Sequence, residues 1–131
     1  MGSRSTARRV AMQAIYQSDV SSVDIEEALD GLFKEEKMTD EARDFSKKLA
    51  IGVIKAKDEL DGRIKDFSKN WTVDRISPVD RSILRIALFE LIHEKDTPRA
   101  VIINEAIELA KRYSDENSAS FINGILGAAV V

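Results

Sequence analysis

Polar and aromatic side chains recur at helical spacing near the start of the chain. Arg9, Gln13 and Tyr16 follow the spacing i, i+4, i+7, which places them on one strip of a helix, and Arg4 and Arg8 lie one turn apart on its flank. Arginine binds phosphate or stacks on a base, and tyrosine offers a platform for an unstacked base. The strip is therefore a candidate surface for single-stranded RNA. A solvated helix face with an exposed tyrosine is the simpler account of the residue types alone.

A second candidate surface lies near the end of the chain, in a helix expected to begin near Asp115. Asn117, Ser120 and Gly124 fall on the side away from its apolar arc, where small side chains allow another helix or an RNA backbone to approach. Phe121 lies at the edge of that arc. From the residues alone, a core Phe121 with tightly packed helices is the simpler reading.

Carboxylates mark a third region. Asp80 and Arg81 open a helix, and Asp80 suits the positive N-terminal end of its dipole. Glu90 and Glu94 lie one turn apart on the same helix and are expected to be mostly solvated. Residues 1–20 contain three arginines and one aspartate, which gives this segment a net charge of +2. Because the net charge of the whole chain is −3, the remaining residues carry a net charge of −5. A basic end on an acidic body indicates one surface for an anion and another for a basic partner.

Composition excludes several functional classes. The 131 residues fit one domain and contain no cysteine and one histidine, so we expect no disulfide, no thiolate or multi-histidine metal site and no cofactor. No apolar run approaches the roughly 20 residues that span a bilayer, and no signal peptide is evident, which favours the cytoplasm. Glu105 and Glu108 are paired carboxylates, but no nucleophile, base and orienting group gather near them, and the chain has no phosphate-binding loop. We therefore expect no enzyme.

Helical periodicity recurs along the whole chain, and alternation typical of strands is absent. The pattern predicts an all-α protein of about seven helices. Helices are expected at 6–19, after Asp24, after Thr39, at 58–69, at 83–92, after residue 97 and from near 115, with a connection at 71–78. The helix after Thr39 is expected to bury residues including Ile54.

The segment 83–92 is apolar except at Arg85 and Glu90, so it should lie in the centre of a bundle. After it, Thr97 is a suitable N-cap and Pro98 suits the first helical position. The following helix should bury a stripe that begins with Val101.

Three ordered motifs go further than periodicity. They read LRIALFEL at 84–91, INEAIELAKRY at 103–113 and SFINGIL at 120–126. At these separations they resemble the NusB transcription antitermination family. Residues 11–16, AMQAIY, also match the family's pattern at the end of the first helix.

This resemblance implies a single RNA-binding domain over 1–131, built as two small helical bundles, with a function that involves no catalysis. The protein would pair with NusE, a small-subunit ribosomal protein, and the pair would bind the boxA element of ribosomal RNA leaders. It would then act in the RNA polymerase antitermination complex, supporting read-through in ribosomal RNA operons.

The resemblance also implies roles for individual residues. Phe121 and the polar turn at Asn117 and Ser118 would lie beside the first helix and touch RNA together with its arginines. Asp80 would face the basic partner. The other candidate residues for binding this partner are Arg81, Glu90 and Glu94. Family members often carry a richer arginine cluster than this chain, and each phosphate contact that is lost removes part of the electrostatic affinity.

Two other functions fit the sequence. The chain would be the accessory RNA-binding domain of an RNA cytosine methyltransferase if it were a fragment of a longer protein. It would be a helical protein–protein adaptor if the thin arginine cluster does not bind RNA. Self-association into a homodimer that covers the RNA face is a further expectation, because an exposed apolar face often binds a copy of itself.

Overall fold

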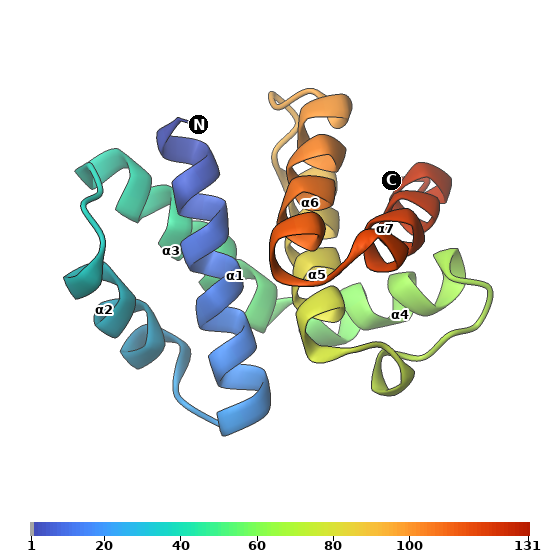
Figure 1. Cartoon of the computed structure of the whole chain (residues 1–131), viewed down its shortest axis with the longest axis horizontal. Helices are drawn as coiled ribbons and strands as arrows, with labels where there is room; N and C mark the ends of the chain where they lie inside the picture. The colour runs from blue at the N-terminus through green and yellow to red at the C-terminus, as the bar shows by residue number, and fades with distance from the viewer. Residues whose placement is uncertain (1) are drawn as a thin grey trace. The chain divides into compact units, whose positions relative to one another are not determined.

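The computed structural model describes residues 2–131 and contains helices but no strand over that range. The order is α1 (Ser3–Ser21), α2 (Ile25–Glu35), α3 (Asp40–Lys55), α4 (Lys57–Phe67), a 3-10 turn η1 (Val73–Arg75), α5 (Pro78–His93), α6 (Arg99–Tyr113) and α7 (Glu116–Ala128). Figure 1 shows this succession from the blue N-terminal helix to the red C-terminal one. The all-α prediction is confirmed. No described helix is both long enough and apolar enough to cross a membrane.

The chain divides into two compact units, residues 1–55 and 56–131. In the first unit, α1 packs against both α2 and α3. Its predicted core face is buried, from Ala7 to Ile15, and its alanines let α3 come close. The closeness is visible in one bond, because the buried Ser46 hydroxyl on α3 donates to the carbonyl of Ala7 at 3.0 Å.

Helices α2 and α3 begin at side-chain caps, directly after the two residues where the sequence predicts a helix start. The Asp24 carboxylate accepts the N–H groups of Glu26 and Glu27, and the Thr39 hydroxyl accepts that of Ala42 at 3.0 Å. The prediction that α3 buries Ile54 is wrong, because Ile54 is exposed. The buried positions of α3 end with Val53, and Ile54 lies 100° further round the helix.

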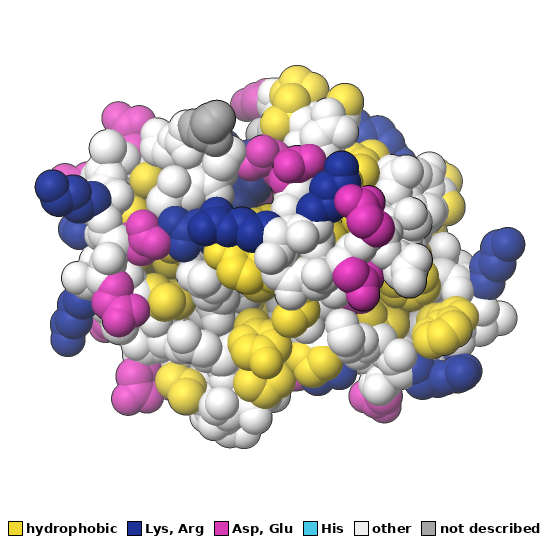
Figure 2. Space-filling model, viewed as in Figure 1, with side chains coloured by type: hydrophobic (Ala, Val, Ile, Leu, Met, Phe, Trp, Pro, Cys, Tyr) yellow, Lys and Arg dark blue, Asp and Glu magenta, His cyan; other side chains and the backbone are white. Residues whose placement is uncertain are grey.

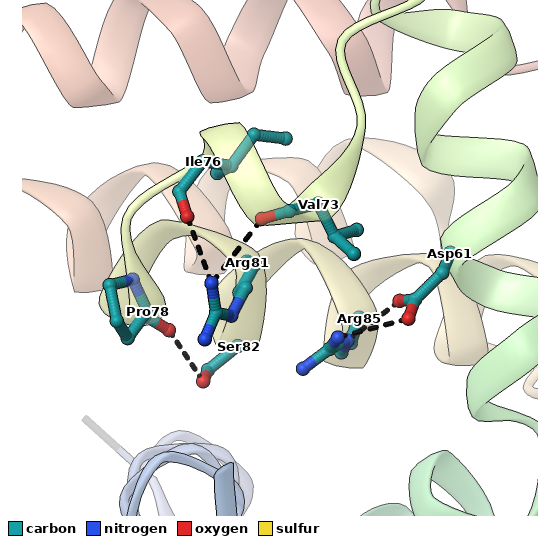
Figure 3. Close-up of polar contacts among 7 residues, drawn as sticks. All are labelled: Asp61, Val73, Ile76, Pro78, Arg81, Ser82 and Arg85. Carbon is teal, nitrogen blue, oxygen red and sulfur yellow. Dashed lines mark hydrogen bonds and ion pairs between the residues drawn. The ribbon is translucent and has the colours of Figure 1, made fainter. Parts of the chain in front are cut away.

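The second unit is organised around α5, which packs against α4, α6 and α7. Every side chain from Ser82 to Leu91 is buried, as predicted for a helix that is apolar nearly all round. The charged exceptions in this stretch are Arg85 and Glu90. The Arg85 guanidinium forms a two-pronged ion pair with Asp61 on α4, at 2.8 Å from Nε and 3.0 Å from Nη2 (Figure 3).

The start and the facing of α6 differ from expectation. Its N-cap is Pro98 rather than Thr97, and its first helical residue is Arg99, because the Pro98 carbonyl already accepts the N–H groups of Val101 and Ile102. The prediction that Val101 is buried is also wrong, since it is 42% exposed. The buried stripe is Ile102, Ala106 and Ala110, at spacing i, i+4, i+8, and Val101 lies 100° from it.

The Arg85–Asp61 pair yields a stability prediction. Asp61→Ala should lower the free energy of unfolding by about 3 kcal/mol, because a buried guanidinium is left without its counter-charge. Glu59→Gln on the same helix is the control. It removes an exposed pair with Arg63 at 3.6 Å and should cost under about 0.5 kcal/mol. Urea denaturation of both variants measures the difference, and equal losses would contradict the importance of the buried pair.

Candidate nucleic-acid interface

The arginines of α1 are held by an aromatic ring of α3. The Arg4 guanidinium lies 4.0 Å from the centre of the Phe45 ring, and the Arg8 guanidinium lies 5.6 Å from it. Both distances fall within the range of cation–π attraction. Arg4 is exposed, whereas Arg8 is only 4% exposed. In this conformation Arg4 offers its charge to a ligand and Arg8 offers almost none of its surface.

The strip predicted on α1 is partly occupied by contacts within the first unit. Arg9 forms an ion pair with Glu36, with its Nη2 at 2.8 Å from Oε1, and its Nη1 also donates to the Gln13 side-chain oxygen at 3.5 Å. Glu36 follows directly after α2 and so reaches α1 from the neighbouring helix. Tyr16 is exposed. Arg4 and Tyr16 are therefore the most open members of the predicted set.

The predicted polar turn of α7 forms a side-chain cap at the start of the helix. Asp115 caps the helix by accepting the Ser118 N–H at 2.8 Å. Asn117 is exposed, and Phe121 is half-buried with its ring 5.9 Å from that of Trp71, edge to face. Phe121 is thus neither a core residue nor a free surface ring, which matches its predicted place at the edge of the apolar arc.

Asp80 takes part in the packing of the second unit. It is 7% exposed, and its Oδ2 accepts the Ser118 hydroxyl at 2.9 Å. Ser118 also shares a 2.7 Å hydrogen bond with Ser114. The other Asp80 oxygen is buried and has no hydrogen-bond partner. The expectation that the Asp80 carboxylate faces a protein partner therefore needs correction, since the carboxylate is turned inward and links α5 to α7.

The remaining charged residues of α5 are also engaged. Glu90 is 1% exposed, so the expectation of a solvated Glu90 is wrong; α5 is covered all along this stretch, and any side chain there is enclosed. Glu94 is half-buried at the C-cap of the helix. Arg81 donates from Nη1 to the carbonyls of Val73 at 3.3 Å and Ile76 at 3.2 Å, as Figure 3 shows. Arg81 thereby ties the loop before α5 to the helix.

Three residues near these surfaces were not singled out from the sequence. Phe45 is one of the residues that the helix after Thr39 is expected to bury, Glu36 has no predicted role, and Trp71 lies in the predicted connection at 71–78. Their importance comes from contacts between different helices, and no local pattern reports such contacts. A lone tryptophan in a loop that ends a helix is the only sequence signal that was available.

Charge on the surface is mixed. Figure 2 shows lysine and arginine side chains interspersed with aspartate and glutamate across the visible face. No group of histidine, cysteine, aspartate and glutamate suited to a metal ion occurs in the described part of the chain. On this face, an RNA contact would depend on a few placed side chains rather than on a broad basic field.

Comparison with known proteins decides the family. The model described as the NusB family matches residues 5–130, nearly the whole chain. The chain belongs to the NusB family. Among its relatives, the NusB proteins of Acetivibrio thermocellus and Bacillus subtilis, both named transcription antitermination protein, are 45% and 46% identical to it. The alignments cover 97% of this chain and 88% of the first protein, and 94% of this chain and 91% of the second.

Solved NusB structures share the fold. T. maritima NusB is 36% identical to this chain and superposes with a TM-score of 0.88, covering 95% of this chain and 87% of that one. A chain from a complex of the antitermination factors NusB and NusE with double-stranded RNA is 28% identical, with a TM-score of 0.89 and coverage of 96% and 94%. The NusB fold expected from the motifs is thereby confirmed.

The candidate residues fall into two groups, each assembled within its own unit. Arg4, Arg8, Arg9, Gln13 and Tyr16 belong to the first unit, and the α7 residues with Asp80 belong to the second. The expectation that Phe121 lies beside the first helix stays a prediction.

The Asp80–Ser118 bond yields a second prediction. Asp80→Ala, Ser118→Ala and the double variant should give a coupling energy of about 1–2 kcal/mol in thermal or urea unfolding, because a hydrogen bond to a charged group is lost in each. Ser120→Ala on the exposed side of the same helix should change stability by less than about 0.5 kcal/mol. If the stability losses of the two single substitutions simply add up in the double variant, the hydrogen bond contributes no coupling energy between α5 and α7.

Proposed function

We propose that this protein is a non-catalytic transcription antitermination factor. It binds single-stranded RNA of the boxA type together with the ribosomal protein NusE, and supports read-through in ribosomal RNA operons. The observation that carries the proposal is the match to the NusB family over residues 5–130, together with a solved relative in a complex with NusE and RNA. That relative's RNA is double-stranded, so strand preference is part of the test below.

The first unit supplies charge and an aromatic ring to the RNA. Arg4 is exposed and held over Phe45, which limits the freedom that it would lose on meeting a phosphate. Tyr16 is open for stacking. Arg9 becomes available when a phosphate replaces the Glu36 carboxylate as its partner. Arg8 acts mainly by positioning in this conformation, since it is covered.

The second unit supplies Asn117, Ser118 and Phe121. Asn117 presents an amide that both donates and accepts, which suits a base edge. The half-buried Phe121 offers part of a ring for stacking. Ser118 is fixed by Asp80, so the turn is already in place before RNA arrives.

The basic partner NusE is proposed to dock near the start of α5. Asp80 contributes there by fixing Ser118, and Arg81 by fixing the preceding loop. Glu94 is the more accessible of the two glutamates assigned to this surface. RNA bound to both proteins would then connect them to the RNA polymerase antitermination complex. A homodimer of this protein would compete with RNA and NusE for the exposed faces.

One observation favours a second candidate function. Arg8 is covered and Arg9 is already paired with Glu36, which leaves Arg4 as the open arginine of the α1 cluster. A protein–protein adaptor that binds NusE without RNA fits that arrangement. The same experiment separates the two functions.

The function is tested by titrating fluorescently labelled boxA-like RNA with the protein, with NusE and with their mixture. The mixture should bind more tightly than either protein alone, and single-stranded RNA should bind more tightly than its duplex. A scrambled RNA of equal length and charge is the control. A protein–NusE complex that adds nothing to RNA affinity would establish the adaptor instead.

A further prediction concerns the ion pair that occupies Arg9. Glu36→Gln should raise RNA affinity roughly two- to fivefold, because the phosphate no longer competes with a carboxylate. The slope of log affinity against log salt should steepen by about 0.7, the value of one phosphate contact on a single strand.

Glu35→Gln is the matched control for this change. Glu35 is the exposed neighbour of Glu36, and its substitution alters net charge by the same amount. Equal affinities for the two variants would mean that Arg9 makes no phosphate contact.

A further inference from the structure

The single tryptophan of the chain stands on the surface next to Phe121. Trp71 is 41% exposed, and the centre of its ring lies 5.9 Å from that of Phe121. The Arg75 guanidinium lies 4.6 Å from the Trp71 ring centre. An exposed indole with a cation on it and a second aromatic ring at its edge has the groups that hold an unstacked base and its phosphate.

The backbone is strained where it places this tryptophan. Helix α4 ends at Phe67, and the N–H of Asn70 bonds back to the carbonyl of Lys65 at 2.8 Å, which closes the helix end. Lys69 has φ of 58° and Asn70 has φ of 73°, both in the left-handed region that favours glycine. Strain of this kind gathers at ligand sites, where the surrounding structure compensates for it.

The rest of the loop is tied down on both sides of Trp71. The Ser68 hydroxyl donates to the Trp71 carbonyl at 3.0 Å. Beyond Trp71, the Arg81 guanidinium bridges the carbonyls of Val73 and Ile76, and Figure 3 shows both bonds. A platform fixed in this way loses little conformational entropy when a ligand stacks on it.

We propose that Trp71 is a base-stacking site for single-stranded RNA, continuous with Phe121, and that Arg75 neutralises the phosphate of the stacked nucleotide. The inference rests on the proposed RNA-binding function and extends it to the loop between α4 and α5. The ring pair favours RNA over an acidic peptide or a second copy of this acidic chain, because only RNA offers a planar base to stack on the indole beside the phosphate that the Arg75 cation attracts. The loop thereby adds a nucleotide to the path that begins at α7.

The lone tryptophan gives a direct test. Titration of the protein with unlabelled boxA-like RNA should quench Trp71 emission and protect it from acrylamide, in step with the binding curve from labelled RNA. Trp71→Leu keeps an apolar side chain without the π-face and should weaken RNA binding roughly 5- to 100-fold. Trp71→Phe should recover much of that loss. Val101→Ala, at a site of matching exposure in the same unit, should leave affinity unchanged.

Arg75→Gln separates the charge from the ring. It should make the salt slope shallower by about 0.7 and leave the quenching of Trp71 in place. RNA that binds with normal affinity to Trp71→Leu, and leaves Trp71 emission unchanged in the unmodified protein, would overturn this inference while the proposed function stands. Labelled RNA that binds neither to the protein nor to its mixture with NusE would overturn both.

Discussion

The second unit depends on enclosing α5 on every side from Ser82 to Leu91. A helix surrounded on every side has no face on which a charge can meet water, yet this one carries Arg85. The two-pronged pair with Asp61 resolves the conflict, because it returns to the guanidinium the hydrogen bonds that burial removed. It also fixes α4 against α5, and the strained loop that presents Trp71 starts where α4 ends. The geometry of a surface residue thus follows from a buried charge.

Most of the fold is encoded in local patterns and was predictable for that reason. The caps at Asp24, Thr39 and Asp115 each act over three residues, and the apolar run of α5 needs no partner to be recognised. Two errors arose where the side of the helix on which a residue lies decides whether it is buried. Val101 and Ile54 lie one residue from a buried position, and a single step turns a helical side chain by 100°.

The sequence predicts which residues belong to the candidate site, but not whether each side chain is exposed, buried or paired. Residue types and spacing identified the arginines and the tyrosine of α1, and the motifs added Phe121. Whether an arginine is open, covered or paired depends on side chains that are distant in sequence, as Phe45 and Glu36 are from α1. Glu90 differs from them, because the apolar run around it already predicts an enclosed helix, and the expectation of a solvated carboxylate rested on its charge alone.

The hydroxyl of Ser118 has a consequence for what it can recognise. It carries one proton, and that proton lies on the bond to Asp80, so Ser114 must be the donor in the bond between the two serines. One lone pair is all that Ser118 retains. A phosphate oxygen offers nothing to that lone pair, whereas a base amino group or a ribose 2′-hydroxyl does. The free capacity of this hydroxyl is thus that of an acceptor alone, which suits a donor group and gives no hydrogen bond to a bare phosphate oxygen.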